Sequence, residues 1–231
     1  MKKFFCLVLS IVCLQFAHAE LALVGKIVYD LDIGRMTATV LNFQTSKEKP
    51  CDVIIPQTIK YKKEVYTVTK LSYRTNFGGD PKLNYDYAEA RSNIEHIIMP
   101  NTMKVISCNS FCGMMRLKEL SIPASVEWLT DIVLVPENCY PKSYKLLLTN
   151  YDSWSKATGL FPRLTKIEVL GKPICVYTEE CERYNPTKIT PDDPDYLKKM
   201  AMVIAGVGTP YAKVICPSLD SFSMPEVEKK E

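Results

Sequence analysis

Histidine is scarce in this chain: His18 and His96 are the two among 231 residues. Metal sites built on several imidazoles are therefore not expected. The cysteines form no C-x-x-C pair, which excludes zinc ribbons and thioredoxin-type motifs. The sequence also lacks the G-x-S-x-G, G-x-x-x-x-G-K-S/T and G-x-G-x-x-G patterns of hydrolases and nucleotide-binding proteins. We expect no catalytic residue, no metal and no cofactor.

The chain also lacks a large net charge of either sign. Removing Lys2 and Lys3 from the 29 basic residues leaves 27 against 26 acidic residues. A near-neutral surface argues against nucleic acid as a partner and provides no polybasic patch for a membrane surface.

Long apolar runs are missing except at the N-terminus. There, Lys2 and Lys3 precede an apolar run over 4–16, and Ala17-His18-Ala19 follows. This order is typical of a secretory signal peptide cleaved after Ala19, and the run is too short to span a membrane. Lipidation at Cys13 is the alternative, but the three residues before it lack the small side chain that such sites need. We expect an exported chain, secreted or held at the cell surface or in the periplasm, with no membrane span once mature.

A phrase of alternating apolar residues closed by proline occurs three times. Its copies are Val53-x-Ile55-Pro56, Ile94-x-x-Ile97-x-Met99-Pro100 and Leu117-x-x-Leu120-x-Ile122-Pro123. The second and third copies are 23 residues apart, and the first lies 44 residues before the second. A period of about 20–29 residues with an L-x-x-L-x-L core is typical of leucine-rich repeats.

Each copy predicts a short strand with one buried face. Leu120 and Ile122 alternate with Glu119 and Ser121, so the first pair should be buried and Glu119 exposed. Pro123 should end the strand, because proline has no N–H for the ladder. Four further apolar residues should turn inward along the return path, and one aromatic ring should fill the interior before the next strand. These are Met103, Ile106, Val126 and Leu129, with Phe111 as the ring.

The phrase Ile-Pro-x-Ser/Thr, followed by Ser110-Phe111-x-Gly113 and L-x-x-L, resembles the BspA-like leucine-rich-repeat family. The resemblance covers residues 51–129. It departs where Met114 stands in place of a common cysteine, and where 78–92 replaces a normal repeat. The resemblance implies an exported or surface interaction protein of anaerobic gut or oral bacteria, often linked to adhesion to host proteins.

The expected fold is α/β and β-rich: a leucine-rich-repeat solenoid with a cap at each end. Stacked repeats bury a continuous core, and terminal repeats need covering. The expected units are a signal peptide (1–19), a β-hairpin cap (20–50), the solenoid (51–184, irregular after about 130) and a C-terminal helix–strand cap (185–231). Weaker apolar patterns predict two strands within 21–43, a hairpin over 61–71, helix over 86–91 and 194–205, repeats at 143–148 and 164–169, and a last strand at 213–217.

Outward strand positions are the expected binding residues: Glu95, His96, Ile98, Lys118, Glu119, Ser121, Thr165, Lys166 and Glu168. Tyr85 and Tyr87 in the insertion are a second candidate contact. Seven cysteines follow Ala19, an odd number, and Cys175 with Cys181 is the most plausible local disulfide. Buried small apolar side chains are the alternative for most of these cysteines.

The pattern favours binding of a macromolecule, a protein or a glycan, at the cell surface. A structural or assembly role in the cell envelope with no outside ligand is the alternative. A cysteine–histidine hydrolase would need His96 beside a thiol. His96 instead occupies an outward strand position equivalent to Glu119.

The signal-peptide hypothesis makes one direct prediction. The purified native protein should begin at Glu20, because Ala17-x-Ala19 suits signal peptidase. N-terminal sequencing checks this. A lipidated start at Cys13, or an intact Met1, would contradict it.

Overall fold

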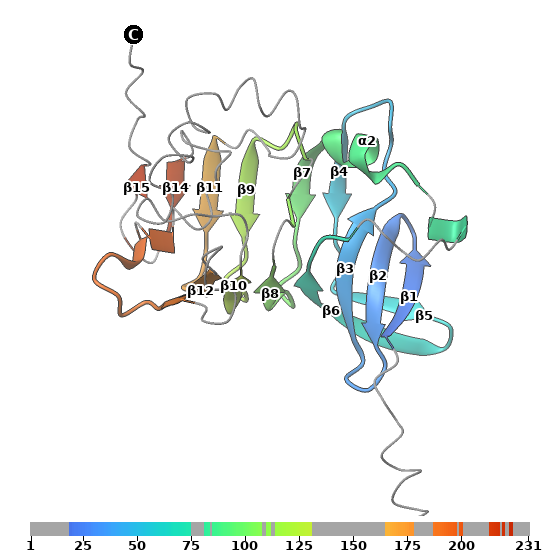
Figure 1. Ribbon diagram of the computed structural model, residues 1–231, viewed down its shortest axis with the longest axis horizontal. Helices are drawn as coiled ribbons and strands as arrows, with labels where there is room; N and C mark the ends of the chain where they lie inside the picture. The colour runs from blue at the N-terminus through green and yellow to red at the C-terminus, as the bar shows by residue number, and fades with distance from the viewer. Residues whose placement is uncertain are drawn as a thin grey trace, which may run out of the picture.

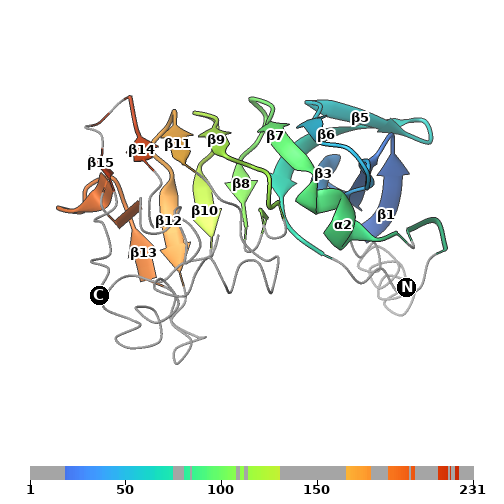
Figure 2. The same ribbon diagram turned by 90° about the horizontal axis from the view of Figure 1, so that it is seen from above.

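The computed structural model describes residues 19–74, 81–83, 85–107, 110–111, 114–130, 165–177, 187–197, 199–200, 213–217, 219 and 222–223. This part of the chain is β-rich, with strands in three sheets and little helix (Figure 1). Two rows of strands run side by side along most of its length, and Figure 2 shows them as separate layers. No helix in these ranges is long and apolar enough to cross a membrane.

The N-terminal strands form an antiparallel meander of β1 (Ala19–Val24), β2 (Ile27–Asp32) and β3 (Thr37–Phe43). Gly25 makes the first turn with φ +62°, a left-handed conformation that costs glycine little. The two strands predicted within 21–43 are β2 and β3. The sequence missed β1, because its apolar side chains continue the N-terminal run and show no alternation.

A second hairpin, predicted over 61–71, joins this meander to the repeats. It consists of β5 (Thr58–Tyr61) and β6 (Glu64–Leu71). The Tyr61 hydroxyl and the Lys62 ammonium both donate to Glu20 Oε1, at 3.2 and 2.6 Å. The bond from Lys62 holds the pKa of the Glu20 carboxyl below its usual value. β6 then pairs in parallel with β3 on one side and with β8 on the other.

The front row contains the strands of the repeat phrase. They are β4 (Cys51–Ile54), β7 (Ile94–Ile98), β9 (Glu119–Ile122), β11 (Lys166–Val169) and β14 (Lys213–Ile215). β4 pairs with β7, and β9, β11 and β14 pair in order, all in parallel. β7 lies beside β9 (Figure 1). The short antiparallel strand β15 (Phe222–Ser223) follows β14, so the strand predicted at 213–217 is not the last.

The return row runs along the other layer. Its parallel strands are β8 (Val105–Ile106), β10 (Trp128–Thr130) and β12 (Ile174–Tyr177), followed by antiparallel β13 (Thr187–Ile189). Successive turns into this row are bonded to one another. Lys104 N donates to Thr69 O (2.7 Å), Glu127 N to Lys104 O (2.8 Å) and Ile174 N to Glu127 O (2.9 Å). Each chain crossing from front to return row is thereby tied to the one before it.

The proline that closes each phrase makes the same turn twice. Met103 N donates to Pro100 O and Val126 N to Pro123 O, each at 3.0 Å. Proline suits this position because it has no backbone N–H, so no donor of the strand ladder is left unpaired where the strand ends. The identical bonds confirm that the two phrases are structural repeats as well as sequence repeats.

The core lies between the two rows. Leu120 is 3% exposed, Ile122 is fully buried and Glu119 is exposed, so the predicted strand register is confirmed. The residues predicted to point inward along the return path are buried too: Met103, Ile106, Phe111, Val126 and Leu129.

The repeat predicted at 143–148 lies outside the described residues. Among the strands that the structure describes, β9 pairs directly with β11, with Leu120 opposite Ile167, and β10 pairs directly with β12. The repeat predicted at 164–169 is present as β11. Of the helix predicted over 194–205, Tyr196, Leu197, Lys199 and Met200 are helical, and 201–205 lies outside the described residues.

The burial pattern predicts unequal effects within one strand. Leu120→Ala should lower the free energy of unfolding by about 2–5 kcal/mol, because it leaves a cavity in the core. Glu119→Ala should change it by roughly 0.5 kcal/mol or less, as for most exposed positions. Urea unfolding of both variants measures this. Equal losses would mean that the side chains of β9 face the other way.

Candidate functional site

The outward side chains of the front row lie on one surface, which we call the outward face. Its members are Asp52, Ile54, His96, Ile98, Glu119, Ser121, Lys166 and Glu168. The parallel registers align them across strands: Asp52 with His96, Glu119 with Lys166, and Ser121 with Glu168. Alternation along each strand turns these side chains away from the core together.

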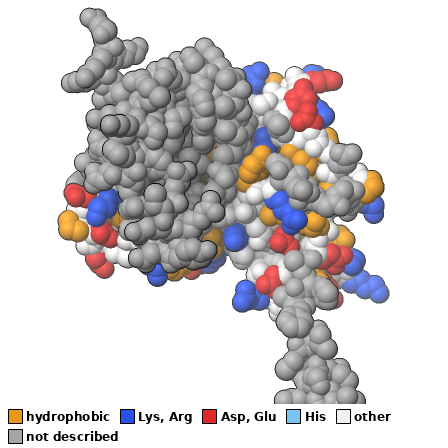
Figure 3. All heavy atoms as spheres, in the orientation of Figure 1, with side chains coloured by type: hydrophobic (Ala, Val, Ile, Leu, Met, Phe, Trp, Pro, Cys, Tyr) orange, Lys and Arg blue, Asp and Glu red, His pale blue; other side chains and the backbone are white. Residues whose placement is uncertain are grey.

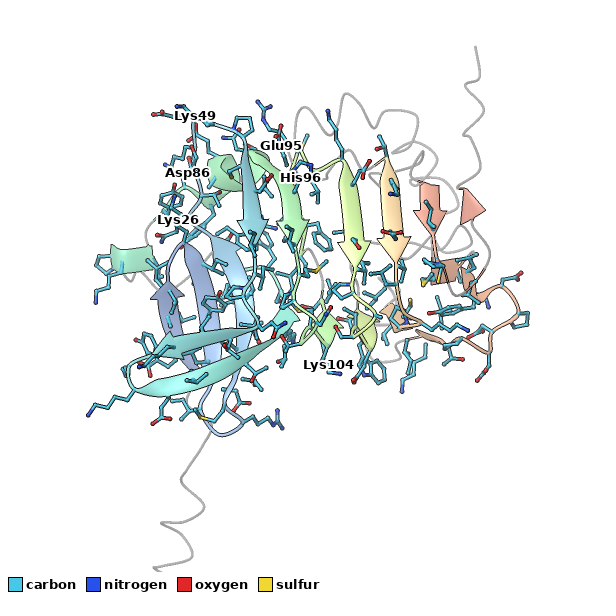
Figure 4. All side chains as sticks on the ribbon, turned by 180° about the vertical axis from the view of Figure 1, so that it is seen from behind. Lys26, Lys49, Asp86, Glu95, His96 and Lys104 are labelled. Atoms are coloured by element: carbon cyan, nitrogen blue, oxygen red, sulfur yellow. The ribbon has the colours of Figure 1, made fainter. Side chains whose placement is uncertain are left out.

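His96 lies against Asp52 across the β4–β7 pair. Its Nδ1 is 2.7 Å from Asp52 Oδ1, and the two side chains are 64% and 61% exposed. A pair this open to solvent contributes little to stability, about 0–1 kcal/mol. It fixes the direction of the imidazole on the outward face, where Figure 4 labels it beside Glu95.

Two isoleucines give the outward face an apolar spot. Ile54 is 67% exposed and Ile98 is 55% exposed, and they are register partners on β4 and β7. Large aliphatic side chains at adjacent exposed positions of a sheet are typical of surfaces that contact another molecule.

The structure brings most of the predicted binding residues together. His96, Ile98, Glu119 and Ser121 are exposed on the outward face, and Lys166 and Glu168 are half-buried there. Three others stand at the start of their strands. Glu95 is half-buried with Oε1 4.0 Å from Arg116 Nη1. The Thr165 hydroxyl donates to the carbonyl oxygen of Lys118, whose side chain is exposed.

Sequence reasoning missed Asp52 and Ile54, although the signal was present. The copy Val53-x-Ile55 places residues 52 and 54 at outward positions, as the later copies place Glu119 and Ser121. The irregular register between Cys51 and Asp52 also explains why Glu95 stands apart, since β7 carries one extra residue there.

The charges on the described surface are mixed. Acidic and basic side chains lie among hydrophobic ones over the part of the described surface that is visible in Figure 3. Within the ranges that the structure describes, no three His, Cys, Asp or Glu side chains gather as metal ligands would.

Tyr87 of the insertion points inward, which corrects the expectation for that residue, whereas Tyr85 is half-buried. The insertion holds a 3-10 turn, η1 (Pro81–Leu83), and a short helix, α2 (Tyr87–Ser92), whose N-cap is Asp86. Tyr87 is 4% exposed and its hydroxyl donates to Leu83 O at 2.9 Å. The hydroxyl of half-buried Tyr85 donates to Thr45 O.

These two tyrosines belong to a second, smaller core on the far side of the meander. Leu83 and Tyr87 pack there against Val28 of β2 and Leu41 of β3. The rings of Tyr85 and Tyr87 meet edge to face, with centroids 5.6 Å apart. Tyr87 therefore has almost no surface to offer a partner, and the insertion braces the meander.

Arg91 ties this insertion to the rest of the molecule. Its side chain is fully buried, Nη1 donates to Asn42 Oδ1 at 3.2 Å, and Nη2 donates to Ser110 O at 2.6 Å. The guanidinium also lies over the rings of Tyr73 and Phe43, at 4.4 and 5.7 Å from their centroids. One side chain thus joins α2, β3 and the turn before β9.

The disulfide predicted between Cys175 and Cys181 is not found. Cys175 is a free, fully buried thiol in β12, and Cys181 lies outside the described residues. Burial raises the pKa of the Cys175 thiol to about 12. Its side chain points into the core. This agrees with the alternative given above, that most of these cysteines are small buried apolar residues. Cys51 is a free thiol as well.

No family model and no curated protein sequence matches the chain. Solved structures similar to it include leucine-rich repeat proteins. One from Bacteroides capillosus has 18% identity and a TM-score of 0.32, covering 47% of this chain and 86% of that one. One from Bacteroides ovatus has 18% identity and a TM-score of 0.36, covering 68% and 37%. A leucine-rich cell surface protein from Faecalibacterium prausnitzii has 12% identity and a TM-score of 0.25, covering 69% and 51%.

These neighbours belong to the class that the sequence phrase predicts. The overlaps are weak, so the repeat arrangement described above rests on the strand registers and turn bonds of this chain itself.

Substitution of Arg91 tests whether its buried contacts stabilise the fold. Arg91→Leu should lower the free energy of unfolding by about 2 kcal/mol or more, because Asn42 Oδ1 and Ser110 O lose a buried donor. Arg35→Leu is the matched control. Its side chain is 83% exposed, so the change should be within roughly 0.5 kcal/mol. Thermal and urea unfolding measure both, and equal stability of the two variants would contradict the role of Arg91.

Proposed function

We propose that this chain is an exported leucine-rich-repeat protein that binds a macromolecular partner, a protein or a glycan, through its outward face. The observation that carries the proposal is the alignment of outward residues across parallel strands, with exposed Ile54 and Ile98 beside a band of charged and polar groups. An apolar spot rimmed by polar side chains is the usual composition of a protein-binding surface.

The charge pattern restricts the partner. The outward face carries the carboxylates of Asp52, Glu119 and Glu168 against the ammonium of Lys166, so it is mildly acidic. A partner with a balanced surface fits this better than a polyanion, and its binding should depend only moderately on salt. Adhesion to a host protein at the cell surface is the form of this role that we favour.

The proposed architecture is a solenoid over 51–184 between two caps. Its support is the pairing order: parallel strands continue through both rows, and antiparallel strands flank them. The β1–β3 meander stands at one end and β13 and β15 at the other. Antiparallel strands at the ends of a stack cover edges that would otherwise stay open. The proposal includes export through the segment 1–19 and a mature chain without a membrane span.

Binding is proposed over catalysis. The Nδ1 atom of His96 contacts the carboxylate of Asp52, and a cysteine–histidine hydrolase would need that ring beside a thiol. The purified His96→Ala variant should therefore have the same hydrolytic activity as the purified wild type.

The outward face can be tested with two variants of equal charge change. Glu119→Ala with Lys166→Ala removes one anion and one cation from the face. Lys104→Ala with Glu127→Ala removes one of each from the turns between the rows, where the two groups form an ion pair of 2.7 Å. Wild type and both variants would be measured on an array of extracellular-matrix proteins and surface glycans.

For any array member that binds the wild type, the face variant should lose about tenfold or more in affinity. The turn variant should stay within about twofold, and both should keep the wild-type melting temperature. Equal affinity of the face variant and the wild type would contradict the assignment of the face. Absence of binding to any array member would favour the envelope role instead.

A further inference from the structure

One edge of β4 is paired with none of the strands that the structure describes. Cys51 N donates to Asn93 O and Ile55 N to Ile98 O, each at 2.9 Å, so the odd-numbered residues of β4 bond to the β7 side. The peptide groups of Asp52 and Ile54 must then point the other way, because alternate residues of a strand face opposite neighbours. Within the described residues, β4 pairs with β7 alone.

A hollow of about 370 Å³ lies along this open edge. Its floor contains the buried side chains of Tyr29, Phe43, Val53 and Ile59. The turn between β1 and β2 forms the opposite wall with Gly25 and Lys26. The edge of β4 is thus one wall of an apolar groove, and Figure 4 shows Lys26 on the meander side of β4.

The shape of the groove selects a single extended segment. A strand added to an edge lies about 4.8 Å away and offers its own N–H and C=O groups in alternation. The edge of a second copy would bring its whole sheet and collide with the β1–β2 turn. A lone peptide strand can enter between the two walls and turn one side chain toward the apolar floor.

The charges at the rim select the chemistry of that segment. Asp52 is already held by His96, whereas no acidic side chain in the described ranges pairs with the exposed ammonium of Lys26. An acidic residue near one end of the entering segment would complement Lys26. An aliphatic residue in its middle would complement the floor.

We propose that this groove binds an extended, acidic and apolar segment of a partner protein, which adds to the edge of β4 as a further strand. The site adjoins the outward face at Asp52 and Ile54 but uses their peptide groups and the floor of the groove, and it needs neither β9 nor β11. It can therefore stand or fail independently of the function proposed above.

The probe is a fluorescein-labelled peptide of nine residues that alternates threonine with valine and carries aspartate near one end. It should bind the purified chain saturably, with a dissociation constant below about 1 mM. The control is the same peptide with alternate backbone nitrogens methylated, which removes the donors that face the edge. Its affinity should fall about tenfold or more, as expected for lost backbone hydrogen bonds. Equal affinity of the two peptides, or no saturable binding of either, would overturn the proposal.

Variants of the chain locate the site. Ile54→Pro removes the N–H on the open edge, where proline is tolerated, and should weaken peptide binding about tenfold. Ile54→Thr keeps that N–H and should bind within about twofold of the wild type. Lys26→Glu should weaken the aspartate-bearing peptide and strengthen one carrying lysine instead.

Binding should also protect the amides of Asp52 and Ile54 from hydrogen exchange, with wild-type melting temperatures confirming that the variants fold. Glu119→Ala with Lys166→Ala should leave peptide binding unchanged. Protection elsewhere, or loss of peptide binding in that double variant, would move the site away from the edge of β4.

Discussion

The parallel hydrogen-bond register between successive front-row strands is the constraint on which the rest of the structure depends. It places Leu120 opposite Ile167 and Glu119 opposite Lys166. Because side chains alternate along a strand, a slip of one residue would exchange the buried and the outward sets. The same hydrogen bonds therefore fix the core and the outward face. The turn bonds through Lys104 and Glu127 keep successive strands of the return row aligned with one another.

A second constraint arises where the meander meets the repeats. Strands pair antiparallel in the meander and parallel in the repeats, so one strand must pair with both. β6 bridges the two by pairing with β3 and with β8. The insertion covers the far face of the meander, and Arg91 joins it to β3 and to the turn at Ser110. A buried guanidinium is costly unless its donors are satisfied, so this junction requires Asn42, the Ser110 carbonyl and the neighbouring rings together.

The sequence predicts the features that depend on local alternation. The three copies of the phrase identify β4, β7 and β9, and their buried and exposed positions follow from the period of two. Features set by distant partners could not be predicted. The two residues of β8 are too few to show a pattern, and the partner of the Tyr85 hydroxyl, the Thr45 carbonyl, is 40 residues away. The apolar pattern of β11 predicts a strand but not its neighbours, and its direct pairing with β9 joins residues 47 positions apart, Leu120 and Ile167.

The binding role proposed for the outward face requires that β9 and β11 are neighbours, because that face is continuous only then. Cross-strand nuclear Overhauser effects on the isotope-labelled protein test this most directly. Backbone amide and α protons of Leu120 should show contacts with those of Ile167, as the parallel register requires. Contacts from Leu120 to residues 146–148 in their place would show that another repeat stands between the two strands and would contradict the account.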